Sequence, residues 1–412
     1  MNFVNRYFKG DPHIWAIIVG LCVFSLLAVY SASGSLAYRF KEGNTAVYII
    51  RHAGLLAIGL SIAFILHRFP YKFYARISQG LMFIVVPLLL FTLLFGVEGN
   101  NATRWLSIFG MTFQTSDLAK IVLIMFIAQQ LARKQDEIQN FKKTLLPMFI
   151  KIGIVCALIL PANFSTAVML FAICVMLLFV GRVPVLQLSG LCAISLVFIG
   201  LFVGSLLGLH KLGVNNVVTQ RATTIVNRFD RFFDKNDTND LLGFNYQENQ
   251  AKIAVGTGGF FPSGPGTSVQ RNFLPHSYSD FIFAIIIEEW GLLIGGLLLI
   301  VLYITLLYRS IVIVQKCDKT FPALLVIGLS LNIVFQAFIN MAVAVGLMPV
   351  TGQPLPLISM GGTSIMFTGA AFGIILSVSR EVNRKDELKT RNRAEERLAV
   401  EESEEGVIIE TS

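Results

Sequence analysis

Charge is scarce in this sequence, and its scarcity is the first constraint on the fold. Of the 412 residues, only 14% are Asp, Glu, Lys or Arg, while 55% are hydrophobic. A soluble domain carries about 25% charged residues, so the two or three soluble domains that the length suggests are excluded. Apolar runs of roughly 20 residues recur along the chain, as membrane-spanning helices require. The sequence therefore predicts an all-α polytopic membrane protein.

Cysteine and histidine are also few, with five of each. Four cysteines lie inside apolar runs and Cys317 lies in a short polar loop. No pair has the spacing of metal ligands, and such cysteines usually behave as small buried hydrophobes. A metal cage built from Cys and His is therefore not expected.

A cleavable signal peptide is missing from the N-terminus. The apolar stretch from Ile14 to Tyr30 is long enough to span a membrane and is followed by further apolar runs, so we expect a retained first helix. Ten transmembrane helices are predicted, at 13–32, 47–66, 77–96, 115–132, 146–161, 163–181, 187–208, 280–308, 321–346 and 360–379.

Lysine and arginine are distributed unequally among the short loops. One alternating set is basic, including 67–76, 133–143, 181–184 and 309–319, and basic loops remain in the cytoplasm. Both termini are then cytoplasmic. The asymmetry also accounts for the net charge of +8, so no nucleic-acid partner is needed.

Two segments are not predicted to span the membrane. The long loop 209–279, between the seventh and eighth helices, faces outward and is too long for a simple connector. Residues 381–412 are highly charged, which predicts a disordered tail or a frayed helix in the cytosol. The chain thus divides into a membrane domain, 1–380, and this tail.

Ionisable residues inside apolar segments need a partner or a polar cavity. Asp117 and Lys120 are three residues apart and share a helix face. They form either a structural ion pair or a cation directed at an anionic group. Asp280 stands where an apolar helix is expected to begin, with Glu288 and Glu289 about two turns deeper. Asp280 is either an N-terminal cap or a functional carboxylate, and we expect the two glutamates to be paired.

Polar residues also form two clusters near the C-terminal end of the membrane domain. Asn332, Gln336 and Asn340 recur every four residues, which indicates one polar stripe that bonds another helix or lines a cavity. Prolines and glycines interrupt 349–364 just before the last helix. Irregular backbone at membrane depth must be buried in protein or line a cavity. The polar groups here are Ser359, Gly361, Gly362 and Thr363.

Three stretches carry a resemblance to a known family. They are "RWLSIFGMTFQTSDLAK" (104–120), "FLPHSYSDFIFAIIIEEWG" (273–291) and "PVTGQPLPLISMGGTS" (349–364). In this order they resemble the motifs of the SEDS family (shape, elongation, division and sporulation), and "GFNYQENQAKIAVGTGGFFPSGPGTSVQ" (243–270) fits the same pattern. The pattern is closer to the FtsW branch than to the RodA branch. The resemblance covers the chain up to about residue 380.

The resemblance implies a peptidoglycan glycosyltransferase that polymerises lipid II at the outer face of the bacterial cytoplasmic membrane, in septal cell-wall synthesis. It implies a class B penicillin-binding protein and other division proteins as partners, besides membrane lipids. It places the catalytic carboxylate at Asp280 and a basic residue at Lys120. Substrate-binding candidates are Lys120, Arg104, Asp117, Ser268, Gln270, Gln336, Asn340, Ser359, Gly361, Gly362 and Thr363, with Glu288 and Glu289 organising the cavity. The family's Glu is replaced by His276.

The implied chemistry suits these residue types. A positioned carboxylate can take the proton of an attacking sugar hydroxyl, and cations stabilise a departing diphosphate. Lys120, Arg104 or a divalent ion, Mg²⁺ or Mn²⁺, would supply that charge. Two alternatives remain open: a transporter that flips lipid II across the bilayer, and a non-enzymatic scaffold of the division machinery.

Overall fold

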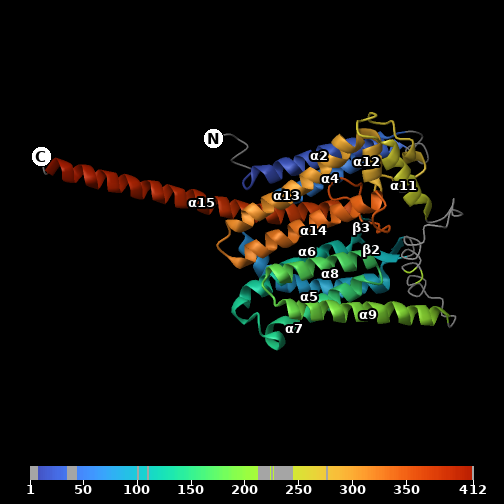
Figure 1. The fold of residues 1–412 in the computed structure, drawn as a ribbon, viewed down its shortest axis with the longest axis horizontal. Coiled ribbons are helices and arrows are strands. Elements are labelled where there is room, and N and C mark those ends of the chain that lie inside the picture. The colour runs from blue at the N-terminus through green and yellow to red at the C-terminus, as the bar shows by residue number, and fades with distance from the viewer. Residues whose placement is uncertain are drawn as a thin grey trace.

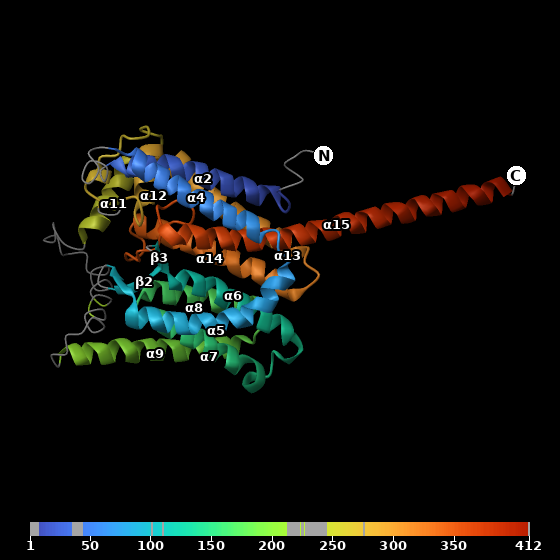
Figure 2. The same ribbon diagram turned by 180° about the vertical axis from the view of Figure 1, so that it is seen from behind.

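The computed structural model describes residues 8–34, 44–99, 102–108, 111–211, 223, 226, 245–274 and 277–410. They form a bundle of long helices from which one helix projects (Figure 1). The start of α2 lies at the end of the bundle where α15 projects, here called the tail end. The sheet strands and α11 lie at the opposite end, here called the loop end, as the view from behind also shows (Figure 2).

Each of the ten predicted spans has a helical counterpart. The helices are α2 (Pro12–Ala32), α4 (Ala46–Leu66), α5 (Tyr71–Phe95), α6 (Thr115–Arg133), α7 (Leu146–Ile159), α8 (Phe164–Val180), α9 (Val185–Lys211), α11 (Asn245–Thr257), α12 (Ile282–Trp290), α13 (Leu298–Gln315), α14 (Thr320–Ala344) and α15 (Gly362–Glu410). In the described residues, eight helical runs are long and apolar enough to cross a membrane. The chain is a polytopic integral membrane protein, as predicted.

The burial of these helices explains how an apolar chain can form a specific bundle. In α6, 83% of the apolar window is buried, whereas in α9 only 6% is. Large apolar side chains of α9 such as Leu186 and Ile194 are exposed, as is normal for a surface solvated by lipid tails. The centre of the molecule is formed by α6, α14 and α15.

Small residues allow α4 and α15 to approach closely. A Cβ atom on Gly369 would lie 2.3 Å from the carbonyl oxygen of Gly59, and one on Gly373 would lie 2.7 Å from that of Ala63. In membranes, where apolar burial against lipid gives little driving force, such close backbone packing replaces it.

A small sheet lies in the loop that separates α5 from α6. Its strands are β1 (Val97–Gly99), β2 (Ala102–Ile108) and β3 (Met111–Gln114), antiparallel in the order β1-β2-β3. In its register Trp105 pairs with Gln114, and Leu106 with Phe113. The prediction of an all-α chain missed this sheet, because its strands are too short to give a clear alternating pattern.

The predicted helix 280–308 is not one straight span. Gly291 has φ +71°, and a Cβ atom on Gly295 would lie 2.8 Å from the carbonyl oxygen of Ile286. Residues nine apart in a straight helix are about 13 Å apart along its axis, so the chain folds back at Gly291. The amide of Leu292 donates to the carbonyl of Gly259, 3.0 Å away. The crossing itself runs through the π-helical segment Gly291–Leu297 and α13.

The last helix does not end near residue 379. It continues as a helix through the charged tail to Glu410, where the sequence suggested either a disordered segment or a frayed helix. The tail is rich in Glu, Lys, Arg and Ala, which favour helix, and Arg391 pairs with Glu395 one turn on. At the base of the projection, Lys385 and Lys389 bind Asp318 in the loop before α14.

Candidate functional site

The core of the candidate site is the irregular segment 345–361, which connects α14 to α15. Residues 353 and 355–359 of this segment are buried in the bundle, where a carbonyl group needs a hydrogen-bond donor. Side chains of three helices supply four: Asn340 to Gln353 (2.7 Å), Gln336 to Pro354 (2.9 Å), Tyr303 to Pro356 (2.6 Å) and Ser25 to Ile358 (2.8 Å). The segment is thus fixed by side chains rather than by regular secondary structure.

Asp280 lies directly against this segment. Asn340 Nδ2 donates to its backbone oxygen at 2.8 Å, and Ser279 Oγ donates to its Oδ1 at 2.9 Å. Ser359 Oγ in turn donates to the backbone oxygen of Ser279 at 2.6 Å. Asp280 is half-buried. Its carboxylate is therefore held in place but is not sealed inside the bundle.

Asp280 does not cap a helix, as one of the two interpretations of the sequence proposed. α12 begins at Ile282, and its N-terminal cap is Phe281, whose side chain makes no capping bond. Asp280 belongs to the turn before the helix.

Lys120 and Asp117 form the predicted pair within α6. Lys120 Nζ lies 2.8 Å from Asp117 Oδ1 and donates to Gln336 Oε1 at 3.0 Å. Lys120 is only 3% exposed. An ammonium has three N–H donors, so these two contacts leave one donor. Through Gln336 the pair is linked to Pro354 and so to the segment beside Asp280.

The predicted polar stripe of α14 is present in part. Gln336 and Asn340 both bond the segment 353–354, which fits inter-helix hydrogen bonding. Asn332 is buried, but its Oδ1 has no partner among the described residues. The period of four correctly placed all three residues on one face, yet the site uses only the two nearest the loop end.

The start of α15 brings the remaining motif residues to the same region. Thr363 Oγ1 accepts from the amide of Gln114 at 3.3 Å, which ties the sheet to α15. Gly361 and Gly362 are half-buried, and a Cβ atom on Gly362 would meet nothing within 4 Å. There is open space beside this turn.

Arg104, on β2, lies beside the turn between α7 and α8. Its Nε donates to the carbonyl of Ala162 at 2.6 Å, and its side chain lines a small cavity of about 20 Å³ that opens to solvent. The other lining residues are Leu89, Thr92, Leu93, Thr115, Ser116, Leu158, Ile159, Ala162 and Asn163. The guanidinium therefore lies where α5 and α6 meet the α7–α8 turn.

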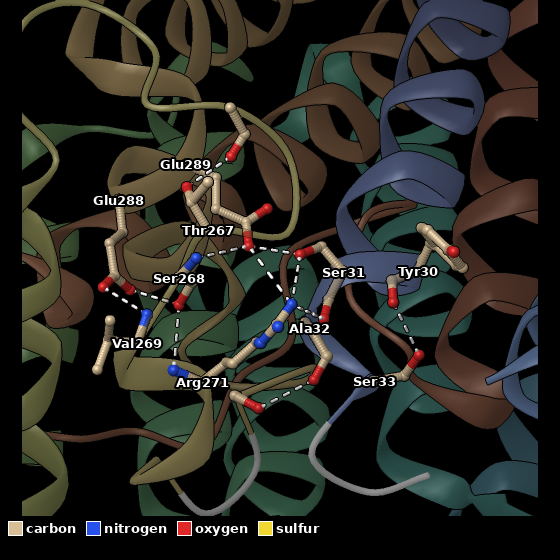
Figure 3. A network of polar contacts seen from close by, with 12 residues as sticks. Tyr30, Ser31, Ala32, Ser33, Thr267, Ser268, Val269, Arg271, Glu288 and Glu289 are labelled. Atoms are coloured by element: carbon tan, nitrogen blue, oxygen red, sulfur yellow. Dashed lines mark hydrogen bonds and ion pairs between the residues drawn. The ribbon is translucent and has the colours of Figure 1, made fainter. Parts of the chain in front are cut away.

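Glu288 and Glu289 both bind the loop 264–271, which precedes α12 (Figure 3). Glu288 accepts from Ser268 Oγ at 2.5 Å, from the amide of Val269 at 3.0 Å and from that of Gln270 at 3.3 Å. Three donors satisfy the buried carboxylate, as expected for a charge removed from water. The predicted pairing of Glu288 with polar groups is confirmed.

Glu289 points to a different neighbour, the end of α2 (Figure 3). It accepts from Ser31 Oγ and from the amide of Ser268, and Arg271 Nη1 lies 4.0 Å from its Oε1. Arg271 also donates to the carbonyl of Ser31 at 3.2 Å. This network joins α2, α12 and the loop 264–271 at the loop end.

The depth predicted for these two glutamates is wrong. Ser31, which contacts Glu289, lies next to the loop end of α2, whereas Ser25, which contacts Ile358 beside the Asp280 turn, lies about 9 Å farther toward the tail end. α12 therefore runs from Asp280 toward the loop end. The reversal at Gly291 makes this possible, and periodicity alone could not reveal it.

Ser268 and Gln270 are accordingly not brought to Asp280. They contact Glu288, and α12 separates them from the Asp280 turn by about 12 Å of helix. Ser268 is buried and already bonded. His276 lies outside the described residues. Within the described ranges, no group of three His, Cys, Asp or Glu residues could hold a metal ion.

Several residues of the site were missed in the sequence. Ser25, His52, Tyr303 and Gln353 are buried and bonded around the irregular segment. A histidine and a serine inside apolar spans are themselves a signal. These residues were missed because they belong to no motif and to no regularly spaced polar pattern.

The fold and site define a polytopic membrane protein with a polar site near one end of its helix bundle. The chain belongs to the family described as "Cell cycle protein", that of FtsW, RodA and SpoVE, whose sequence pattern matches residues 12–384. The resemblance drawn from the motifs is thereby confirmed.

Curated relatives extend over nearly the whole chain. The sequence is 34% identical over 376 residues to "Probable peptidoglycan glycosyltransferase FtsW" of Coxiella burnetii, covering 89% of this chain and 96% of the relative. It is 31% identical over 385 residues to the protein of the same name from Bacillus subtilis, with 92% of each chain covered.

Two solved structures share the fold. One is described as "Structural coordination of polymerization and crosslinking by a peptidoglycan synthase complex", with 24% identity, TM-score 0.69, and coverage of 90% of this chain and 98% of that chain. The other is the rod shape determining protein RodA of Thermus thermophilus, with 23% identity, TM-score 0.63, and coverage of 91% and 98%.

Proposed function

We propose that this protein is a peptidoglycan glycosyltransferase that polymerises lipid II for septal cell-wall synthesis. The observation that carries the proposal is the half-buried carboxylate of Asp280, fixed by Ser279 and Asn340 beside a polar segment inside an otherwise apolar bundle. The names of the full-length FtsW relatives support the same activity.

In the proposed reaction, Asp280 acts as the general base. The acceptor sugar hydroxyl gives its proton to the Asp280 carboxylate while its oxygen attacks the anomeric carbon of the donor sugar. The bond from that carbon to the lipid diphosphate breaks, and the diphosphate leaves with the electron pair. The hydrogen bond from Ser279 fixes the direction of the carboxylate for this step.

Positive charge must balance the departing diphosphate. Lys120 is the nearest candidate on the connected network, with one N–H donor left, although burial and Asp117 reduce its effect. Arg104 lines the cavity beside the α7–α8 turn. A Mg²⁺ or Mn²⁺ ion would be a third source of charge, held mainly by the substrate diphosphate and water, so that the Asp280 carboxylate stays free to act as the base.

The loop end is proposed to face outward and both termini the cytoplasm, since the basic loops lie at the tail end. That orientation places Asp280 near the outer leaflet, where the sugars of lipid II stay in water and the lipid tail lies among the helices. A class B penicillin-binding protein and other division proteins are the proposed partners. The first of these is supported by the likeness of this fold to a chain from a peptidoglycan synthase complex that coordinates polymerization and crosslinking.

The test uses purified protein and lipid II in detergent micelles, which have no two sides to cross. Glycan strands resolved on a gel are expected from the wild-type protein and are expected to be lost in Asp280→Asn. Asp318→Asn, which changes an exposed carboxylate at the tail end, serves as the matched control and should polymerise normally.

The outcomes separate the alternatives. A transporter would give no polymer in micelles. If the protein is a scaffold, the Asp280→Asn variant should still support cell growth and should still co-purify with its partner. Near-normal polymer from purified Asp280→Asn would refute the general-base role.

A further inference from the structure

Ser25, one of the hydrogen-bond donors to the irregular segment, is itself in contact with His52. Ser25 Oγ donates to the carbonyl of Ile358 at 2.8 Å and lies 2.7 Å from Nε2 of His52 on α4. Both side chains are completely buried. Since the single hydroxyl proton is directed at Ile358, Nε2 must carry a hydrogen and donate to Ser25. In the neutral ring that carries this hydrogen, Nδ1 has none and can only accept a hydrogen bond.

This arrangement is costly for a residue that only fills space. Nδ1 of His52 is buried and has no hydrogen-bond partner among the described residues. A buried polar atom without a hydrogen-bond partner destabilises the folded state. A leucine would occupy the same position between α2, α4 and the segment without that cost. Compared with leucine, His52 adds an N–H group that donates a hydrogen bond to Ser25. Ser25 in turn donates a hydrogen bond to the irregular segment.

The bond to Ile358 is adjacent to the contacts of the catalytic turn. The next residue, Ser359, donates to the backbone of Ser279 at 2.6 Å, and Ser279 donates to Asp280 Oδ1 at 2.9 Å. A shift of Ile358 therefore displaces Ser359, then Ser279, and then the carboxylate. Tyr303, by comparison, holds Pro356, two residues farther from Ser359.

We propose that His52 is a positioning residue, which through Ser25 holds Ile358 and thereby sets the place of the Asp280 carboxylate. The proposal rests on the proposed function, in which Asp280 is the base. His52 does not touch the reacting atoms. Its effect on the rate is geometric, because small displacements of a catalytic group lower the rate strongly while leaving substrate binding nearly intact.

The experiment compares Ser25→Ala, His52→Leu and His52→Gln in the full-length protein. Polymerisation of lipid II gives kcat and KM, and hydrogen–deuterium exchange follows the peptide that contains 353–361. We expect Ser25→Ala and His52→Leu to lower kcat by about tenfold or more with KM changed less than about twofold. Exchange of 353–361 should rise in both. His52→Gln keeps a side-chain N–H donor and should recover most of kcat.

Ser310→Ala is the matched control. It removes another completely buried hydroxyl, 2.6 Å from Ser330, at the α13–α14 contact, and should leave kcat and the exchange of 353–361 unchanged. The proposal is wrong if Ser25→Ala and His52→Leu lower only the melting temperature, or if Ser310→Ala lowers kcat equally. Unchanged exchange at 353–361 would also overturn it. Should wild-type protein make no polymer, the proposed function fails, while the exchange measurement still tests the placement by His52.

Discussion

The ammonium of Lys120 and the carboxylate of Asp117, one turn apart on α6, form an ion pair of 2.8 Å in which both side chains are almost completely buried. A buried pair adds little net stability, but loss of one partner leaves an uncompensated charge. Because Lys120 also bonds Gln336, the pair couples α6 to α14 and to the segment beside Asp280.

Removal of one charge and removal of both should therefore have different effects. Lys120→Met leaves Asp117 unpaired and is expected to destabilise the protein by about 3–5 kcal/mol. The double variant Asp117→Asn/Lys120→Met should regain most of the melting temperature in detergent, yet should remain defective in polymerisation because the cation is gone. A stable and fully active double variant would assign the pair a purely structural role.

The contact between α4 and α15 predicts a sharp contrast among glycines. Gly369→Ala would place Cβ 2.3 Å from the backbone of Gly59, and overpacking of this kind costs about 1–3 kcal/mol. Gly54→Ala, on the exposed side of the same α4, meets nothing within 4 Å and should stabilise the helix by up to about 1 kcal/mol. Melting temperatures of the two variants test this, and equal values would contradict the packing argument.

The membrane spans were predictable because lipid imposes a length and a composition on each helix separately. The ion pair of Asp117 and Lys120 was predictable for the same local reason, a spacing of one turn. The reversal at Gly291 was not, because it depends on contacts with Gly259 and Phe260 some thirty residues earlier. Likewise, Ser25 and Ile358 are 333 residues apart, and nothing local to either indicates the other.

The proposed orientation predicts which residues can be labelled from outside the cell. In a variant without the five native cysteines, Phe261→Cys lies at a 77% exposed position of the loop end, and Lys389→Cys lies on the projecting part of α15, with its side chain 60% exposed. A membrane-impermeant maleimide should label position 261 on intact cells and position 389 only after permeabilisation. The reverse pattern would invert the orientation and move Asp280 to the cytoplasmic side.

The contacts of Glu288 predict how firmly the loop 264–271 is held. Glu288→Leu removes the acceptor of three hydrogen bonds, from Ser268, Val269 and Gln270. Loss of even ~1.4 kcal/mol of local stability raises the open population tenfold. Trypsin cleavage after Arg271 should therefore accelerate by about tenfold, seen by mass spectrometry as a fragment that begins at Asn272.

Glu248→Gln provides the comparison for that experiment. It breaks an ion pair with Lys252 on α11 whose lysine is about half exposed, and such pairs contribute about 0–1 kcal/mol. Cleavage after Arg271 should then stay near the wild-type rate. If Glu248→Gln accelerated cleavage as much as Glu288→Leu, the loop would be held by α11 rather than by the carboxylate of α12. The assignment of Glu288 as its anchor would then be wrong, because only the α12 variant removes bonds made by the loop itself.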